Sequence, residues 1–321
     1  MAGVLQELPE GAAVAVVRLR SLGDCVLTTP ALSILKQARP DLRLAVVVEE
    51  RFADIFVPNP DVDAVLPPSV TAVRGLNPVL CLNLHGGTRS MALTTASGAG
   101  WRAGFAHFRA PAVYNVKIPT AQEILGVERK VHTAEHLASA MFYLGAPPSP
   151  IPAARLFVQG MGYIPLANAR GSGLSRDRKG AVIAQYAVIH PVAATPEKTW
   201  PAERFLAIAR HVSRDYEPVF IGGPGDDLSA FTEFRTVAGA PLQDTKTLLA
   251  SAALFIGNDS GPAHMAAAFG VPVVVLFGPS DPVVWAPWQV EARTLVGKDG
   301  DIRTIRITQV IEALEEIRVT Q

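Results

Sequence analysis

Four polar loops carry the residues that could do chemistry, and each follows an apolar run that predicts a buried strand. The first loop, Ser21-Leu22-Gly23-Asp24, places a carboxylate at a strand end, just before a predicted helix. A carboxylate there could accept a proton as a general base if it faces a cleft. The alternative is that Asp24 only caps the helix that follows.

The second loop, residues 190–201, has the composition of an anion-binding site. Its small residues would let backbone amides approach a ligand closely, while Thr195 offers a hydroxyl and Lys198 a positive charge. The amides and the dipole at the start of the next helix both favour a negatively charged group. The alternative is a surface loop with a solvated lysine.

The third loop, residues 222–227, is a glycine-rich turn. Gly223 permits close approach of the backbone to a ligand. Asp226 or Asp227 could bind ribose hydroxyls or cap a helix, and the two roles are compatible.

The fourth loop, residues 258–264, combines a carboxylate with a predicted helix start. Ser260 and the amides after it favour an anion. Asp259 would be costly beside a phosphate unless it accepts hydrogen bonds from sugar hydroxyls. His264, taken alone, fits a hydrogen-bonded helix residue better than a ligand.

The elements that must position these loops alternate between strands and helices. Apolar runs predict strands at 13–19, 43–49, 62–66, 79–84, 102–105, 187–190 (with a start as early as 181), 218–222, 254–257 and 273–277. Helical patterns cover 28–38, 51–57, 88–97, 133–144, 201–213, 226–237, 246–252, 262–269 and 308–317, with Pro30 in a first turn capped by Thr28 or Thr29. This alternation predicts an α/β protein with parallel sheets, in which ligands bind beyond the carboxyl ends of the strands.

Length and composition narrow the class further. A chain of 321 residues is long for one core and suits two domains, and the Pro-rich run 146–152 places their boundary within 146–180. Lys and Arg equal Asp and Glu in number, so the chain has no charge bias toward nucleic acid. Cys25 and Cys81 lie in apolar contexts without metal spacing, and the N-terminus has no signal-peptide pattern. We therefore expect a cytoplasmic protein, at most peripheral at the inner face of the cytoplasmic membrane.

One stretch departs from this neutrality. Residues 70–135 hold seven basic and three acidic side chains, a local charge of +4, and residues 106–132 within it show no clear period. The stretch is either a solvated face or a surface for an anionic acceptor.

Taken together, the loops resemble glycosyltransferase family 9, the heptosyltransferases of the lipopolysaccharide inner core. The resemblance lies in VVRLRSLGDCVLTTPAL (16–32), HPVAATPEKTWP (190–201) and IGNDSGPAHMAAAFGVPVVVLFGPSDP (256–282). FIGGPGD (220–226) and NLHGGTRS (83–90) agree more loosely. Val192 stands where the family more usually has glycine, and the segment 239–253 is short.

The resemblance implies a GT-B fold, with two Rossmann-like domains and parallel sheets facing an interdomain cleft. An acceptor-binding domain would span 1–155 and a nucleotide-sugar domain 156–321, with the last helix able to pack back on the first domain. The donor would be ADP-heptose and the acceptor an anionic, lipid-linked oligosaccharide at the inner membrane surface. Transfer would invert the sugar configuration and need neither a metal nor a cofactor.

The resemblance also implies roles for residues of the loops. Asp24 would be the general base and Lys198 would neutralise the pyrophosphate. The donor would contact Thr195, Gly223, Asp226, Asn258, Asp259, Ser260, Gly261 and His264, with Asp259 on the heptose hydroxyls and Asp226 on the ribose. The acceptor residues would include Gly23, His85, Arg89 and Arg109. Two alternatives stay open: a transferase of this family for another nucleotide sugar or glycan, and a non-catalytic nucleotide-sugar-binding protein.

Overall fold

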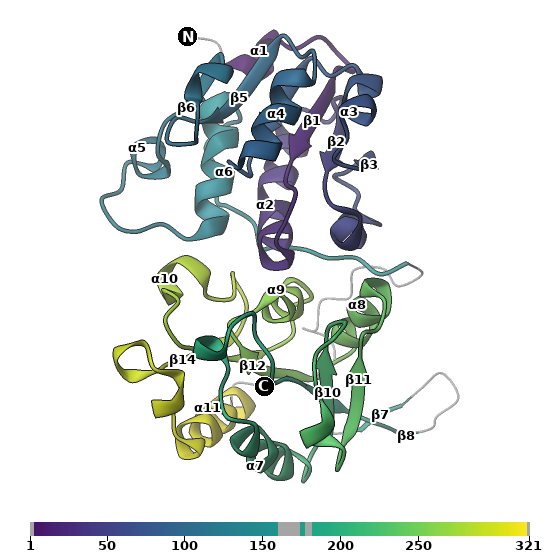
Figure 1. Cartoon of the computed structure of the whole chain (residues 1–321), viewed down its shortest axis with the longest axis vertical. Coiled ribbons are helices and arrows are strands. Elements are labelled where there is room, and N and C mark those ends of the chain that lie inside the picture. The colour runs from purple at the N-terminus through teal and green to yellow at the C-terminus, as the bar shows by residue number, and fades with distance from the viewer. Residues whose placement is uncertain (1–2, 160–173, 177–181, 320–321) are drawn as a thin grey trace. The chain divides into compact units, whose positions relative to one another are not determined.

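Two six-stranded parallel sheets form the frame of the chain in the computed structural model, which describes residues 3–159, 174–176 and 182–319 (Figure 1). The chain divides into two compact units, and the boundary between them in the sequence lies between Phe157 and Val158. The predicted α/β class with parallel sheets is therefore confirmed. Part of the expected boundary region, 146–180, and position 181 lie outside the described residues.

Both sheets have the same strand order, which is that of the Rossmann fold. The first is ordered β3 (Ala64–Leu66), β2 (Arg43–Val47), β1 (Ala13–Val17), β4 (Leu80–Asn83), β5 (Trp101–Phe105) and β6 (Val116–Ile118). The second is ordered β11 (Arg235–Ala238), β10 (Glu217–Gly222), β9 (Tyr186–His190), β12 (Leu254–Asn258), β13 (Val273–Phe277) and β14 (Ala292–Val296). A separate antiparallel pair joins β7 (Leu174–Arg176) and β8 (Val182–Ala184). The strand order reverses between β1 and β4 and between β9 and β12, so each unit has a switch point where ligands of such folds bind.

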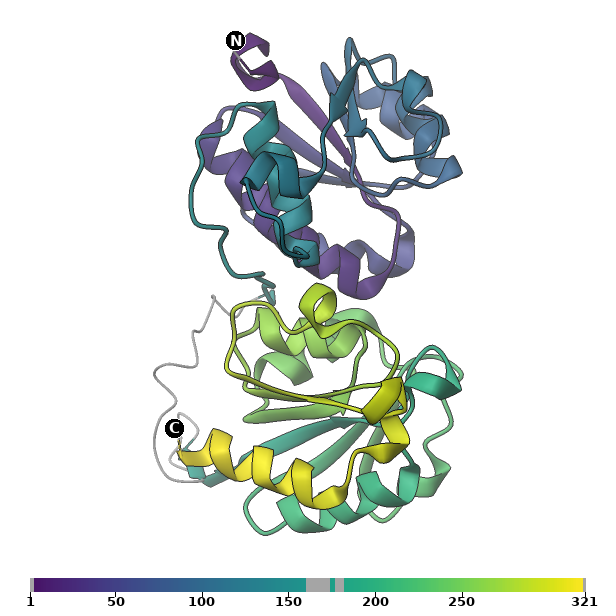
Figure 2. The same cartoon turned by 90° about the vertical axis from the view of Figure 1, so that its left-hand side faces the viewer.

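Helices cover both faces of the first sheet (Figure 2). Helices α2 (Leu22–Ala38) and α6 (Thr133–Leu144) pack side by side on one face. Helices α3 (Val70–Leu76) and α4 (Thr88–Ala96) pack on the other, where Val73 and Leu93 join a buried cluster with Val17 of β1. Short elements complete the unit: α1 (Val4–Glu7), α5 (Ala121–Leu125) and the 3-10 turns η1 (Glu50–Phe56) and η2 (Pro111–Val113).

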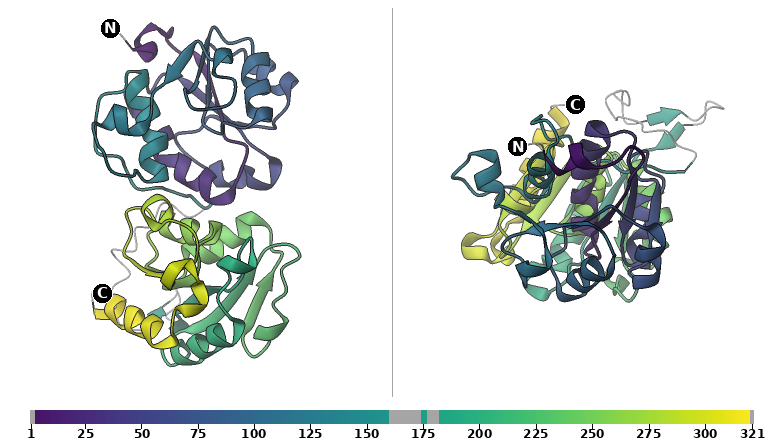
Figure 3. Two further views of the ribbon diagram at one scale, coloured as in Figure 1. Left: turned by 60° about the vertical axis from the view of Figure 1, so that its left-hand side comes forward. Right: turned by 90° about the horizontal axis from the view of Figure 1, so that it is seen from above.

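The second sheet is covered in the same way. Helices α7 (Ala202–Val212) and α11 (Ile307–Val319) lie together on one face (Figure 3). Helices α8 (Leu242–Ala250) and α9 (Gly261–Ala268) pack against each other on the other side of β12. The short elements are α10 (Pro282–Trp285), η4 (Pro196–Lys198), η5 (Ser229–Phe231), η6 (Lys298–Gly300) and η7 (Ile302–Thr304). Within the described residues, no helix is both long enough and apolar enough to cross a bilayer.

Helix α11 uses its apolar face within the second unit. Val310, Leu314 and Ile317 are buried in the cluster that also holds Phe205 of α7 and Phe220 of β10. Helix α11 therefore packs on the sheet of its own unit.

Helix α2 begins at Leu22, six residues before the predicted start. Ser21 is its N-cap, with a capping box to Asp24, so neither Thr28 nor Thr29 caps it. Pro30 lies inside the helix and cannot donate to the carbonyl of Val26. The Thr29 hydroxyl donates to that carbonyl instead, at 2.8 Å, which lets the helix continue through the proline.

Two further stretches differ from expectation. The predicted helix 226–237 is instead the short 3-10 helix η5 followed by strand β11. Strand β11 pairs in parallel with residues 219–222 of β10. The segment 106–132, predicted as a loop, contains η2, the edge strand β6 and helix α5. Strands β6 and β11 both lie at the edge of a sheet and depend on pairing with a neighbouring strand. The local pattern of apolar residues does not reveal such pairing.

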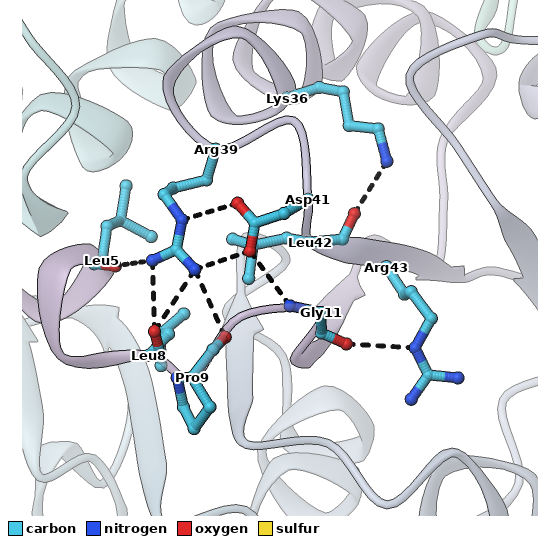
Figure 4. Close-up of polar contacts among 9 residues, drawn as sticks. All are labelled: Leu5, Leu8, Pro9, Gly11, Lys36, Arg39, Asp41, Leu42 and Arg43. Atoms are coloured by element: carbon cyan, nitrogen blue, oxygen red, sulfur yellow. Dashed lines mark hydrogen bonds and ion pairs between the residues drawn. The ribbon is translucent and has the colours of Figure 1, made fainter.

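The amino end of the first sheet is fastened by Arg39, at the C-terminal end of α2 (Figure 4). Its guanidinium donates to the carbonyls of Leu5, Leu8 and Pro9 and to the carboxylate of Asp41. These bonds hold the pKa of Asp41 below its usual range. Residues before β1 are thereby tied to this edge, which is opposite the switch point.

Candidate active site

Asp24 lies just beyond the carboxyl end of β1, in the first turn of α2. Its Oδ2 accepts bonds from the amide and the hydroxyl of Ser21, at 3.3 and 3.0 Å. Its Oδ1 lies 3.3 Å from Nη1 of Arg18. The side chain is still 23% exposed, and a carboxylate offers about four lone-pair sites. Asp24 therefore takes part in capping the helix, and its carboxylate keeps unused acceptor sites, so its role as a general base stays a prediction.

Arg18, which the sequence analysis did not single out, is the charged partner of this carboxylate. It is 6% exposed, and in the described part of the chain its Nε has no hydrogen-bond partner. Burial lowers the pKa of Arg18, and the charge of Asp24 opposes that shift. The sequence did offer a signal, because Arg18 directly follows a buried strand. An arginine is rarely buried without a partner, so an acidic residue nearby could have been expected.

His85 follows β4, on the other side of the same switch point. The side chain of Asn83 shapes its loop by accepting bonds from the amides of His85 and Gly86, at 2.9 and 3.1 Å. Burial first, and then the charge of Arg18, lowers the pKa of His85, while Asp24 raises it. The structure therefore brings His85 and Asp24 into one electrostatic environment.

The other acceptor residues are less closely grouped. Gly23 is buried in the first turn of α2, while Arg109 is exposed. Arg89 is exposed in the first turn of α4 and lies 3.6 Å from Glu49. The ring of Phe108 would be 2.6 Å from a Cβ on Gly86, so the loop before Arg109 packs against the His85 loop.

The basic stretch 70–135 is partly a structural feature. Arg74 donates to the Ala96 carbonyl, and Arg102 donates to the carbonyls of Val113 and Ala99. Arg129 forms a two-pronged pair with Glu135, at 2.6 and 2.8 Å. These three arginines hold loops in place. Their positive charges therefore have a structural role and are not all available for an anionic acceptor.

In the second unit, an ion pair joins the loops after β9 and β12. Lys198 Nζ lies 3.0 Å from Asp259 Oδ2. The Asp259 side chain is 8% exposed and that of Lys198 33% exposed, so the pair stands at the border between core and solvent. Two residues predicted from separate loops are thus in direct contact at the switch point.

Ser260 occupies the N-cap position of α9 but makes no side-chain cap bond. Its hydroxyl instead lies 3.0 Å from Nδ1 of His190, at the end of β9. Burial lowers the pKa of His190 to about 4, so this ring is neutral at pH 7. The first turn of α9, starting at Gly261, therefore keeps its positive dipole end available beside the Lys198–Asp259 pair.

Asn258 has a different place from the one expected. It is fully buried; its oxygen accepts from the amide of Trp200 and its nitrogen donates to the carbonyl of Pro191, at 3.1 and 2.9 Å. These two bonds hold the loop after β9 in place.

The remaining donor residues lie around this centre. Asp226 Oδ2 accepts from the amide of Gly223 at 2.7 Å and so closes a turn, while Leu228 is the N-cap of the short 3-10 helix η5 that follows. Its charge also reaches His190. Thr195 is exposed at the start of η4, and His264 is buried within α9.

Gly278, which follows β13, is a positioning residue that the sequence analysis missed. A Cβ there would lie 2.6 Å from the carbonyl oxygen of Glu197, so only glycine lets the Lys198 loop pack this closely. Val192 is partly buried and packs against the apolar cluster of the second unit. Close backbone approach depends on tertiary packing, which the sequence alone does not report.

The chain is similar to known proteins over most of its length. The model of glycosyltransferase family 9 (heptosyltransferase) matches residues 73–314. Lipopolysaccharide heptosyltransferase 3 of Escherichia coli strain K12 is 27% identical over 313 residues, covering 84% of this chain and 83% of the relative. Lipopolysaccharide heptosyltransferase 1 of the same strain is 25% identical over 302 residues, covering 84% and 88%.

Solved structures share the fold over almost the whole chain. A glycosyl transferase family 9 structure from Veillonella parvula DSM 2008 has a TM-score of 0.79 at 23% identity, covering 97% of this chain and 98% of that one. An E. coli heptosyltransferase solved with ADP has a TM-score of 0.76 at 20% identity, covering 95% and 99%.

Proposed function

Because this chain belongs to glycosyltransferase family 9, the heptosyltransferases, we propose that it transfers heptose from ADP-heptose to an anionic, lipid-linked oligosaccharide of the lipopolysaccharide inner core. The observation that carries the proposal is the contact between Lys198 and Asp259, 3.0 Å apart beside the first turn of α9. A cation, a nearly buried carboxylate and a helix N-terminus at one switch point suit a diphosphate joined to a sugar.

The donor half of the reaction depends on charge at the leaving group. As the bond to the sugar breaks, negative charge grows on the diphosphate of ADP. The ammonium of Lys198 and the amides at the start of α9 would stabilise that charge, which is the role a metal plays in other transferases. Asp259 would accept hydrogen bonds from heptose hydroxyls, and Ser260, oriented by neutral His190, would contact the diphosphate.

The acceptor half depends on Asp24. Its carboxylate would take the proton of the acceptor hydroxyl as the oxygen attacks the anomeric carbon. The carbon–oxygen bond to the diphosphate breaks, and its electron pair leaves with ADP. Attack on the face opposite the leaving group inverts the configuration. We propose that this takes place at the cytoplasmic face of the inner membrane, where a lipid-linked acceptor would present its glycan.

The test is direct. Purified protein, ADP-heptose and a truncated core acceptor should yield ADP and an acceptor heavier by one heptose in the mass spectrum. The anomeric proton coupling in the product distinguishes inversion from retention. No transfer to any core acceptor, together with turnover of another nucleotide sugar, would instead establish the second candidate within the family.

The third candidate, a binding protein without catalysis, has its own signature. It would show calorimetric binding of ADP-heptose and no release of ADP with any acceptor. The presence of both Asp24 and Lys198 supports catalysis over binding alone.

A further inference from the structure

Glu49 holds two exposed arginines at the carboxyl edge of the first sheet. Its Oε2 accepts bonds from Nε and Nη2 of Arg51, at 3.1 and 2.9 Å. Its Oε1 lies 3.6 Å from Nη1 of Arg89. The three side chains, which we call the arginine clamp, together keep a net positive charge because one carboxylate serves two guanidinium groups.

Each arginine of the clamp has a second anchor. The Arg51 guanidinium lies over the ring of Phe52, 4.7 Å from its centroid. Arg89 Nη2 donates to the carbonyl of Pro68 at 3.2 Å. Long exposed side chains usually lose rotamer freedom when they bind a ligand, and here that freedom is already reduced. A guanidinium also has more N–H donors than either arginine uses in these contacts.

The clamp lies next to the strand that leads to Asp24. Glu49 follows β2, and its amide donates to the carbonyl of Leu19 at 3.1 Å. Arg89 comes from the first turn of α4, after β4. Both β2 and β4 are direct neighbours of β1 in the sheet. The clamp and Asp24 therefore share one edge of the same unit.

A purely structural ion pair does not account for this arrangement. Glu49 would be neutralised by Arg51 alone, and the second guanidinium adds repulsion between like charges at an exposed site. A guanidinium with spare donors suits a carboxylate or a phosphate, and here two guanidinium groups are anchored on one carboxylate.

We propose that the arginine clamp binds an oxyanion of the acceptor, a carboxylate or a phosphate, and thereby presents the acceptor hydroxyl to Asp24. This rests on the proposed function, since it assigns part of that acceptor site. It makes Arg51 and Arg89 binding residues and Glu49 the positioning residue that aligns them.

The first experiment measures acceptor KM in Arg51→Ala and Arg89→Ala. Each should raise the acceptor KM by roughly ten-fold, the usual effect of losing a charge-assisted hydrogen bond, and leave the donor KM unchanged. The matched control is Arg43→Ala. Arg43 is an exposed arginine of β2 at the opposite end of the strand, where it donates to the Gly11 carbonyl (Figure 4). An unchanged acceptor KM in both clamp variants, with transfer intact, overturns the clamp and leaves the proposed function standing.

The second experiment identifies the oxyanion. One batch of acceptor is dephosphorylated and another has its carboxyl groups reduced. With the batch that lacks the recognised group, Arg51→Ala should no longer raise the acceptor KM. In that batch the wild type has no oxyanion to bind either, so the substitution removes no further interaction. A loss that persists on acceptor stripped of both groups overturns the proposal.

A final arm covers failure of the transfer assay itself. If the wild type transfers no sugar, calorimetry of the acceptor alone still tests the clamp. Weaker binding to Arg51→Ala than to wild type and Arg43→Ala supports it, and equal binding to all three overturns it.

Discussion

Lys198 Nζ lies 3.0 Å from Asp259 Oδ2, so one charge-assisted hydrogen bond joins the loops after the adjacent strands β9 and β12. Each residue was expected to serve a different part of the donor. Because the two side chains form an ion pair, removing either charge leaves the other without its partner. A substitution of either residue should therefore affect both transfer and stability.

Lys198→Met should abolish most transfer. The variant keeps the length of the side chain but removes the charge that would stabilise the leaving diphosphate, and loss of one such group typically costs about 10²–10³ in kcat. The partner carboxylate loses its cation as well, so unfolding free energy should fall by on the order of 1 kcal/mol. Single-turnover kinetics and urea denaturation measure the two effects. Lys298→Met, an exposed lysine of the same unit, is the control and should leave kcat unchanged.

Asp24→Asn should reduce transfer by about 10²–10⁴ while donor binding stays intact, because a general base is lost but its volume is kept. Arg18, which is buried beside it, would then lack its counter-charge, so stability should also fall. Activity assays and calorimetry with ADP-heptose measure these effects.

A double variant separates the two roles of Asp24. Arg18→Met combined with Asp24→Asn should recover stability without recovering activity, because no buried charge is left unpaired. Full activity in either Asp24→Asn protein would refute the base assignment.

Gly278→Ala should weaken donor binding. The new Cβ would meet the Glu197 carbonyl oxygen at 2.6 Å, and because that atom belongs to the backbone, the Lys198 loop must move. We expect the donor KM to rise roughly ten-fold, as for other displaced ligand contacts. Gly75→Ala is the matched control, since a Cβ at Gly75 meets no atom within 4 Å. An unchanged donor KM would show that the loop position does not matter.

Stability should depend on pH through His136. Burial, with the charges of His107 and Arg18, lowers its pKa from 6.5 to about 4 in the folded protein. Between these values the unfolded chain binds one more proton than the folded one. The contribution of neutral His136 to the free energy of unfolding is therefore complete above pH 6.5. It is lost as the pH falls toward 4, by up to about 1.4 kcal/mol per pH unit.

His136→Phe isolates that contribution. The phenyl ring can keep the stack on Phe105, whose centroid is 4.0 Å away, but it cannot titrate. Urea midpoints measured between pH 7.5 and pH 4.5 should fall less steeply than in the wild type. Identical slopes for both proteins would show that His136 does not set the acid sensitivity.

Buried strands and the loops after them were predictable from the sequence, because parallel strands covered on both faces appear as continuous apolar runs. Asp24, Lys198 and Asp259 were selected for the same reason, since each lies in the segment that follows such a run. What the sequence did not show depends on tertiary contacts. β11 was predicted as a helix because its pairing with β10 cannot be seen in local periodicity.

The misplaced start of α2 has a local cause. Pro30 suggested a first turn, and only the bond from the Thr29 hydroxyl to the Val26 carbonyl explains how the helix runs through it. Gly278 and the Glu49–Arg89 half of the arginine clamp depend on contacts between residues far apart in the chain. Arg18 contacts Asp24 only six residues away, but both side chains must be placed by the turn between β1 and α2. Asn258 shows the converse, since a polar residue inside a binding motif turned out to be part of the core.

The common strand order of the two sheets has an evolutionary consequence. Each half of the gene encodes a complete Rossmann-like unit with its own core and its own switch point. Recombination near the codons for Phe157 and Val158 could therefore exchange one half as a working module. On the function proposed above, a lineage built in this way would acquire a new acceptor by replacing the first half and would keep its donor chemistry.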